Sequence, residues 1–372
     1  MKGLSRSFAL LMVVALVAAA CAEEDDTAGP SPTGPLAGAD THVCYVSDTG
    51  GVDDKSFNQK IHTGFQQAEA ELGVQYTFVE STSAADYAPN LLNFVNQDCD
   101  LIAPAGFNFG PATVESATAN TDQLYAIFDY DILDFSTTPP EDLTFENVRE
   151  LTYQTDQAAF LAGYLAAGMT ESGTIGTYGG VLFPTVTIFM NGLSAGVRAY
   201  NQDNGTSVEV LGWNPDTQTG VEISTDPAVG FDNAAEGRRV AEDFIAEGAD
   251  IILPVAGPTG LGSAAAAQDA GGVSLLWVDD DGCVTAPEFC PLFLTSILKN
   301  MDVSAFETTQ SVIDGTFTGG LFVGTLENEG VGLAPYHEFE DVIPQELKDK
   351  IEELRQGIIA GTVSVNPADY PA

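Results

Sequence analysis

The chain has 372 residues, of which 54 are Asp or Glu and 12 are Lys or Arg, so its formal charge at pH 7 is −42. This length fits two domains of about 150 residues each, and a hydrophobic share of 44% is enough to fill their cores. The charge excludes nucleic acid as a partner, because phosphates would be repelled, and argues against a basic patch that docks on an anionic membrane. Such an acidic surface opposes self-association, so we expect a monomer.

The first 20 residues are typical of an export signal that ends at a lipid attachment site. Two basic residues precede residues 8–20, a run of 13 uncharged residues that is too short to cross a bilayer core of about 30 Å. Small residues stand directly before Cys21, as in a bacterial lipobox, although Ala18 occupies a position where leucine is commoner. We expect a lipoprotein signal peptide over residues 1–20 and a diacylglycerol on the Cys21 sulfur. The alternative is ordinary signal cleavage beside an incidental cysteine.

Residues 21–40 are first acidic and then rich in Thr, Ala, Gly, Pro and Ser, with little to bury. This composition predicts a flexible tether between the lipid and a globular body. No other segment approaches the length of a membrane span. We therefore expect the protein on the extracytoplasmic face of the cell membrane, anchored to it without crossing it.

Four further cysteines allow two disulfides in an exported protein. Cys44 and Cys99 open expected strands that can be neighbours, and Cys283 and Cys290 bracket one loop, so these two pairings are favoured over the other combinations. A zinc site built from all four is the alternative, but no C-x2-C pair is present. The three histidines show no metal-ligand spacing, so we expect no bound metal.

Short apolar runs alternate with helical patterns from residue 43 onward. In the first half of the body, the expected strands are 43–46, 74–79, 100–105, 124–128 and 147–153. The expected helices are 54–72, 85–97 and 111–120, and Gly73 ends the first of them.

The alternation then restarts. The expected strands of the second half are 173–178, 207–213, 250–255, 273–278 and 292–298, with two short strands near Phe322 and Val331. The expected helices are 155–169, 186–200, 234–247, 263–270, 302–314 and 344–357.

Strand–helix alternation with short loops predicts parallel sheets covered by helices on both faces. Two such runs in series indicate two doubly wound lobes, in which ligands bind outside the carboxyl ends of the strands. At these ends the chain has residues that let a backbone approach a ligand or that accept hydrogen bonds: Asp48, Gly106 with Phe107, Asp129, Gly179, Gly180, Gly257 and Asp279. Turn formation is the alternative role for any single one of them.

The segment VSDTGGVDDKSFNQ, residues 46–59, resembles the opening signature of the basic membrane protein family. The similarity continues in family order to about residue 335. It is specific again in the loop at 257–262 and weaker at Asp129, 160–166, 192–196, 230–232, 278–281 and 295–300. Members of this family are lipid-anchored substrate-binding proteins of ABC importers, and several bind purine nucleosides. The departures are Pro258, where members often have glycine, and longer loops at 131–145 and 282–291.

The resemblance implies a type I periplasmic-binding-protein fold, an α/β fold in which a hinge joins two doubly wound parallel-sheet lobes. By analogy with that fold, the chain crosses between the lobes near Tyr153, Asp281 and Phe322. The N-terminal lobe is then expected at residues 41–153 and 282–321, and the C-terminal lobe at 154–281 and 322–372.

The resemblance also implies a nucleoside pocket between the lobes, without a cofactor. Phe57 and Phe231 are expected to stack on the two faces of the base, Asp129 to accept from a purine N–H, and Asp279 to bind ribose hydroxyls. Lys299 is expected to pair with Asp279. The full expected ligand-binding set is Asp48, Ser56, Phe57, Asn58, Gly106, Phe107, Asp129, Phe231, Gly257, Gly260, Asp279 and Lys299. The alternatives are a core position for Phe57 and helix caps for Ser56 and Asn58.

We therefore interpret the chain as a non-enzymatic solute-binding lipoprotein that closes on a purine nucleoside and delivers it to an ABC permease. Three alternatives stay open: a sensory receptor of the same fold, a receptor for a sugar or other small polar metabolite, and a secreted serine hydrolase. The hydrolase reading rests on a G-x-S-x-G pattern around Ser194. That pattern needs a strand before the serine, whereas residues 186–200 predict one continuous helix.

Overall fold

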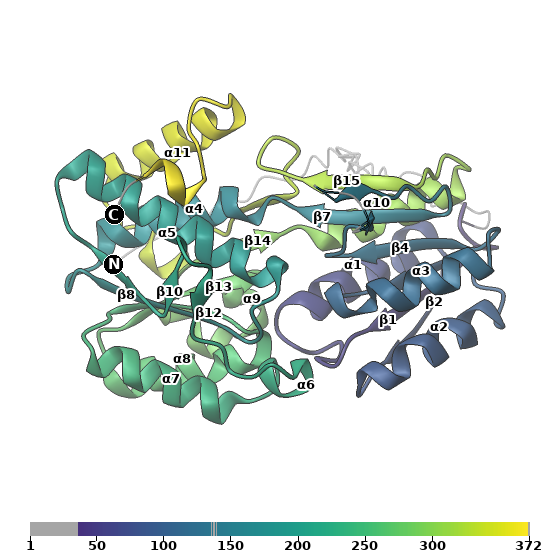
Figure 1. The fold of residues 1–372 in the computed structure, drawn as a ribbon, viewed down its shortest axis with the longest axis horizontal. Coiled ribbons are helices and arrows are strands. Elements are labelled where there is room, and N and C mark those ends of the chain that lie inside the picture. The colour runs from purple at the N-terminus through teal and green to yellow at the C-terminus, as the bar shows by residue number, and fades with distance from the viewer. Residues whose placement is uncertain (1–35, 135, 137, 139, 371–372) are drawn as a thin grey trace, which may run out of the picture. The chain divides into compact units, whose positions relative to one another are not determined.

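The structure, a computed structural model, describes residues 36–134, 136, 138 and 140–370 (Figure 1). The expected signal peptide, Cys21 and most of the expected tether lie outside this part of the chain. Residues 36–372 form one compact unit. In the described residues, no helix combines the length and the apolar character that crossing a membrane requires.

The first lobe contains a six-stranded parallel sheet with the strand order β15-β7-β4-β3-β1-β2. Its strands are β1 (His42–Ser47), β2 (Gln75–Glu80), β3 (Leu101–Pro104), β4 (Leu124–Phe128), β7 (Val148–Tyr153) and β15 (Gly320–Gly324). Its helices are α1 (Phe57–Leu72), α2 (Tyr87–Val95), α3 (Gly110–Ala119) and α10 (Met301–Ile313), with short 3₁₀ turns η1 (Ala84–Asp86) and η2 (Phe107–Phe109). A small antiparallel pair, β5 (Leu133–Asp134) with β6 (Glu141–Asp142), lies in the long loop after β4.

The second lobe repeats this plan with the strand order β16-β14-β13-β12-β8-β9, in which only β16 runs antiparallel to its neighbour. Its strands are β8 (Thr174–Gly179), β9 (Glu209–Leu211), β12 (Ile251–Val255), β13 (Ser274–Asp279), β14 (Phe293–Lys299) and β16 (Val331–Leu333). Its helices are α4 (Thr155–Met169), α5 (Pro184–Asn204), α6 (Pro227–Gly230), α7 (Ala234–Ala246), α8 (Gly260–Ala270), α9 (Gly282–Thr285) and α11 (Gln345–Ile359). Shorter elements are β10 (Trp213–Asn214), β11 (Thr219–Gly220), η3 (Gly257–Thr259), η4 (Pro287–Leu292), η5 (His337–Phe339) and η6 (Pro367–Asp369).

Both sheets bury side chains on both faces, as parallel sheets require. On β1, Val43 and Tyr45 pack in one core with Phe65 of α1, while Cys44 and Val46 pack in another core beyond the opposite face. In the second lobe, α4 and α5 cover one face of the sheet, and α7 and α8 cover the other (Figure 1). The expected fold class is therefore the observed one.

The lobe boundaries differ from the expectation at two crossings. Residues 282–299 belong to the second lobe, because β14 continues the sheet beside β13, with Asp279 paired to Leu298. The expected crossing near Asp281 is therefore wrong, and the chain crosses at Asn300, after which α10 packs on α1. The third crossing follows Gly324, because β15 pairs with β7 and β16 pairs with β14. Alternating strands and helices do not specify which sheet a strand joins.

The expected tether also ends earlier than residue 40. The Gly38 N–H donates a hydrogen bond to the Leu72 carbonyl oxygen at 2.9 Å, and the Leu36 side chain lies against Gly73. Residues 36–40 thus pack on the end of α1. Gly73 caps that helix in a left-handed conformation with a φ of 79°, as its position after the last apolar residue predicts.

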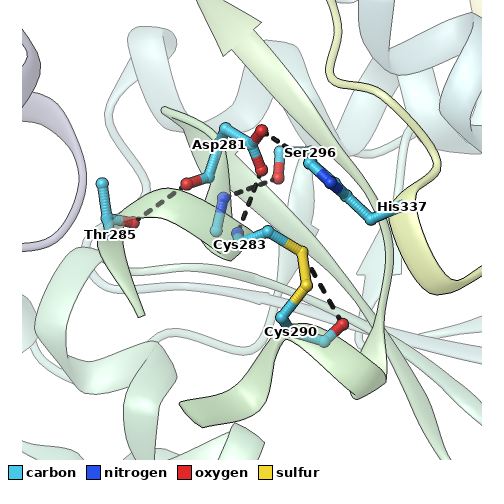
Figure 2. The surroundings of a disulfide bond; sticks show 7 residues. Asp281, Cys283, Thr285, Cys290, Ser296 and His337 are labelled. Carbon is cyan, nitrogen blue, oxygen red and sulfur yellow. Dashed lines mark hydrogen bonds and ion pairs between the residues drawn. A yellow bond between two sulfur atoms is a disulfide. The ribbon is translucent and has the colours of Figure 1, made fainter. Parts of the chain in front are cut away.

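Both favoured disulfides are formed, Cys44–Cys99 and Cys283–Cys290. The first joins β1 to the loop before β3, its neighbour in the sheet. The second closes the loop between β13 and β14, next to His337 (Figure 2). His337 Nε2 lies 2.8 Å from Asp281 Oδ2, which fixes the start of this loop.

Candidate functional site

A cavity with about 660 Å³ of empty space, part of it open to solvent, lies at the carboxyl ends of strands from both sheets. Residues at or just after the ends of β1, β3 and β4 line it from the first lobe, and residues at the ends of β12, β13 and β14 line it from the second lobe. The expected residues in this lining are Asp48, Ser56, Phe57, Asn58, Gly106, Phe107, Asp129, Phe231, Gly257, Asp279 and Lys299.

Gly260 is the expected residue that the lining lacks. It begins α8, and a Cβ atom at this position would lie 3.0 Å from the ring of Trp277. Its lack of a side chain therefore serves the packing of α8 on β13. A glycine at a strand end looks the same in sequence whether it faces a ligand or a neighbouring ring.

The two lobes contribute matching strand ends to the cavity. Gly106 follows β3 with a φ of 104°, and Gly257 follows β12 with a φ of 52°. Asp129 follows β4 with a φ of 58°, and Asp279 ends β13 with a φ of 67°. Asp tolerates this left-handed conformation better than most residues. The chain thus turns sharply at equivalent points and leaves two buried carboxylates in one cavity.

Lys299 lies between these carboxylates with a side chain that is only 2% exposed. Its Nζ is 2.5 Å from Asp129 Oδ2 and 3.8 Å from Asp279 Oδ1. The expected ion pair with Asp279 is therefore present, and the shorter contact, a hydrogen bond, goes to Asp129. Lys299 Nζ also lies 5.0 Å from the centre of the Phe189 ring and 5.8 Å from that of Phe57.

Burial is the main influence on these carboxyl groups. It raises the pKa of Asp279 to about 6, although Lys299 and the Ser56 hydroxyl oppose the shift. Burial also raises the pKa of Asp129, again against Lys299. Asp279 Oδ2 accepts a hydrogen bond from Ser56 Oγ at 2.7 Å, while the buried Oδ1 has no hydrogen-bond partner among the described residues. Such an unpartnered buried oxygen suits a donor group on a ligand.

The Asp54 carboxylate holds the start of α1 in place. Asp54 accepts hydrogen bonds from the backbone N–H groups of Ser56, Asn58 and Gln59 at 3.0, 2.8 and 2.9 Å. Asp54 therefore caps this helix, and the Ser56 side chain makes no capping hydrogen bond. Burial raises the pKa of Asp54 to about 7, against these three donors.

Asn58 connects three other polar groups at this helix start. It accepts from Tyr45 Oη at 2.9 Å and donates from Nδ2 to Asp48 Oδ1 at 2.7 Å and to Asp54 Oδ2 at 3.1 Å. Burial raises the pKa of Asp48, while the Asn58 hydrogen bond lowers it. Asn58 thus orients the Asp48 carboxylate at the cavity.

Aromatic rings enter the cavity from both lobes. Phe57 and Phe107 come from the first lobe, and Phe231 comes from the second. Sequence reasoning missed two further rings of the second lobe, Phe183 and Phe189. Phe183 stacks on Phe107 across the lobes, with ring centres 5.2 Å apart and an interplanar angle of 29°. The sequence signal for Phe183 was its position just after Gly179 and Gly180, at the end of an expected strand.

The position of Ser194 contradicts the interpretation of the chain as a serine hydrolase. This serine lies in the middle of the continuous helix α5, is 2% exposed, and donates to the Met190 carbonyl oxygen at 2.8 Å. A nucleophile elbow needs a strand–turn–helix. The flanking Gly192 and Gly196 instead let α5 lie against the backbone of α4.

Among the described residues, no His or Cys side chain lines the cavity, although four carboxyl groups do. Two clusters with metal-ligating side chains lie elsewhere in the described chain, His42 with the first disulfide and His337 with the second. Their cysteine sulfurs are bonded to each other.

A family model and individual relatives match most of this chain. A family model described as "ABC transporter substrate-binding protein PnrA-like" (Bmp) matches residues 42–227 and 216–369. The CD4+ T-cell-stimulating antigen of Listeria innocua is 30% identical over 98% of this chain and 99% of its own length. The ABC transporter nucleoside-binding protein BmpA of Lactococcus lactis is 27% identical over 96% of this chain and 97% of its own.

Solved structures agree on the fold. An ABC transporter solute-binding protein from Aeropyrum pernix has a TM-score of 0.74 at 24% identity, over 87% of this chain and 92% of its own. A solute-binding protein from Conexibacter woesei has a TM-score of 0.66 at 18% identity, over 87% of this chain and 98% of its own. The family model places the chain in the class of ABC transporter substrate-binding proteins.

Within that class, the chain belongs to the Bmp family of PnrA-like substrate-binding proteins. The resemblance to the basic membrane protein family is therefore confirmed. Membership implies a ligand, a permease partner and a place outside the cytoplasm. The role described for the family is to bind a substrate.

Proposed function

We propose that this protein binds a purine nucleoside between its two lobes and delivers it to the permease of an ABC importer. The observation that carries the proposal is the pairing of aromatic rings from both lobes with buried carboxylates at one cavity. A nucleoside has a flat base for the rings and N–H and O–H donors for the carboxylates. A relative of similar length is named a nucleoside-binding protein.

The base is assigned to the space between Phe57 and Phe231, as the sequence predicts. Phe107 and Phe183 already contact each other, so a base enters between those two rings only if the lobes part. Asp129 then accepts from a base N–H. Asp279 Oδ1, which has no hydrogen-bond partner among the described residues, accepts from a ribose hydroxyl.

The charge of the cavity favours a neutral ligand over a phosphorylated one. Lys299 is the single cationic side chain among the described lining residues, and four carboxyl groups, Asp48, Asp54, Asp129 and Asp279, share the same lining. A phosphate would meet these groups in a partly dehydrated site, where repulsion is screened little. We therefore assign nucleosides, and not nucleotides, as the ligand class.

The N-terminal segment completes the proposal. Cys21 follows small residues as in a lipobox, and a lipid on its sulfur would keep the receptor on the outer face of the cell membrane. A signal peptide over residues 1–20 delivers the chain there. Replacing Cys21 with Ala should release the protein from the membrane fraction, whereas continued membrane retention would contradict lipid anchoring.

A thermal-shift panel tests the ligand assignment. Residues 22–372, stripped of co-purified ligand, are heated with guanosine, adenosine, inosine, uridine, free bases, ribose and hexoses. A ligand at about 100 times its dissociation constant adds about 2.7 kcal/mol of stability, which shifts the melting temperature by a few degrees. Shifts with purine nucleosides but not with ribose or hexoses support the proposal. A shift with a sugar alone supports a sugar receptor instead.

A further inference from the structure

Lys60 of α1, in the first lobe, lies between two carboxylates that belong to different lobes. Its Nζ is 3.0 Å from Asp280 Oδ1, just after β13 of the second lobe, and 3.0 Å from Asp302 Oδ2, on α10 of the first lobe. The side chain of Lys60 is 14% exposed and that of Asp280 is 12% exposed. Burial alone would lower the pKa of Lys60, but Asp302 and Asp280 raise it above its usual value, so the amine stays charged.

We propose that Lys60 is a positioning residue that latches the lobes in the closed arrangement, independently of which ligand the cavity holds. When the lobes part, Lys60 keeps its pair with Asp302, which moves with α1. When they close, Lys60 regains its pair with Asp280. The latch rests on the two-lobe fold and not on the nucleoside assignment.

Asp302 is what makes such a latch reversible. When the lobes part, water can replace Asp280 at the ammonium, and the ion pair with Asp302 on the same lobe remains. Because α10 packs on α1 within the first lobe, Asp302 neutralises Lys60 in both arrangements. Opening therefore breaks one ion pair, and it leaves Lys60 paired with Asp302 while the Asp280 carboxylate loses its cation.

The second-lobe half of the latch is held rigidly. The Asp281 N–H donates to Asp280 Oδ1 at 2.8 Å, and the Gly282 N–H donates to Ser296 Oγ at 3.0 Å. Asp281 itself is fixed by His337, beside the Cys283–Cys290 disulfide (Figure 2). The Asp280 carboxylate thus needs little reordering to meet Lys60, which lowers the entropy lost on closure.

Other hydrogen bonds cross between the lobes. Trp277 Nε1 of the second lobe donates to the Lys55 carbonyl oxygen of the first lobe at 3.0 Å, outside the cavity lining, and two further contacts lie within that lining. Ser56 donates to Asp279, and Lys299 donates to Asp129; all four residues line the cavity. Lys60 and Asp280 are absent from that lining. Substitutions of Lys60 or Asp280 therefore report on lobe closure without removing a ligand contact.

Single-molecule fluorescence of residues 22–372 tests the latch without any ligand. Ala119→Cys on α3 and Gln268→Cys on α8 are exposed positions, one in each lobe, for the two dyes; the native cysteines of the body are in disulfides and do not react. We expect Lys60→Met to shorten the dwell time of the closed state about tenfold, which is about 1.4 kcal/mol. Asp280→Asn should do the same, and the double variant should shorten it no further.

The controls separate the latch from a general loss of stability. Lys60→Arg should restore most of the dwell time, and Asp302→Asn should not shorten it, because the pair between the lobes remains. Lys350→Met, which removes a partly exposed lysine paired with Glu353 on α11, should match the wild type.

If folded Lys60→Met and Asp280→Asn keep the wild-type dwell time, or if the wild type shows no closed state without ligand, the proposal is wrong. A protein that binds no nucleoside would overturn the ligand assignment alone.

Discussion

Phe57 is the residue on which the proposed stacking depends most. An aromatic ring stacked on a base contributes about 1–3 kcal/mol, so Phe57→Ala should weaken inosine binding about 10- to 100-fold by titration calorimetry. Phe78→Ala is the matched control, because Phe78 lies on β2 and is 44% exposed outside the cavity. Unchanged inosine affinity in folded Phe57→Ala would remove Phe57 from the site.

Asp279 should make stability depend on pH in a defined window. Its pKa in the folded protein is about 6, above the ordinary 3.8, so the folded state binds a proton more readily than the unfolded state. The raised pKa of Asp279 therefore adds its full contribution to the free energy of unfolding below pH 3.8. This contribution is lost as the pH rises through about 6. Urea unfolding at pH 4, 5, 6 and 7 should show a flatter pH dependence for Asp279→Asn than for the wild type.

The exposed Asp122 provides the control for this titration. Asp122→Asn removes an exposed carboxyl group outside the cavity and should keep the wild-type slope between about pH 4 and 6. Identical slopes for Asp279→Asn and the wild type would show that the Asp279 carboxyl group does not cause the dependence.

At the level of residues, the sequence predicted which strand ends would lie at the cavity, because these positions have a local signal. Asp129, Gly257 and Asp279 follow apolar runs, so the topology of a doubly wound sheet brings them to one cavity. Phe189 carries no such signal, because it lies inside α5 and looks like a core residue. Its position at the cavity depends on how the two lobes pack, which the local sequence does not show.

At the scale of elements, the close contact between α4 and α5 gives a prediction. A Cβ atom at position 196 would lie 2.0 Å from the Phe160 carbonyl oxygen. Gly196→Ala must therefore push the two helices apart, and overpacking of this kind costs about 1–3 kcal/mol. Chemical unfolding should show this loss.

Gly332→Ala is the control substitution, because its added methyl group meets no atom within 4 Å. It should change the free energy of unfolding little. Equal stability of Gly196→Ala and the wild type would mean that the helices separate at no cost. The G-x-S-x-G pattern would then need an explanation other than packing.

Elements with strong periodicity were predictable almost to the residue. The expected helix 155–169 and the expected strand 124–128 match α4 and β4. The expected helix 85–97 instead divides into η1 and α2 and ends at Val95. Which sheet a strand joins was the hardest feature to predict from the sequence. Residues 293–299 pair with β13 through contacts that no local sequence pattern encodes.

The charge of the whole molecule predicts a response to salt. A net charge of −42 repels itself in the compact state, and raising ionic strength from 0.1 to 1 M shortens the screening length from about 10 to about 3 Å. The melting temperature should therefore rise by several degrees in KCl. An equal osmolality of sorbitol should give a smaller rise, and a melting temperature that falls with KCl would contradict this account.

A crystal structure of the liganded protein would show whether one purine nucleoside lies between the lobes. Ligand-stripped protein would be crystallised with guanosine in large excess. We expect density for one guanosine, with the base between Phe57 and Phe231, a base N–H near Asp129, and a ribose hydroxyl within hydrogen-bond distance of Asp279 Oδ1. A closed cavity that excludes guanosine, or a guanosine bound elsewhere on the protein, would contradict it.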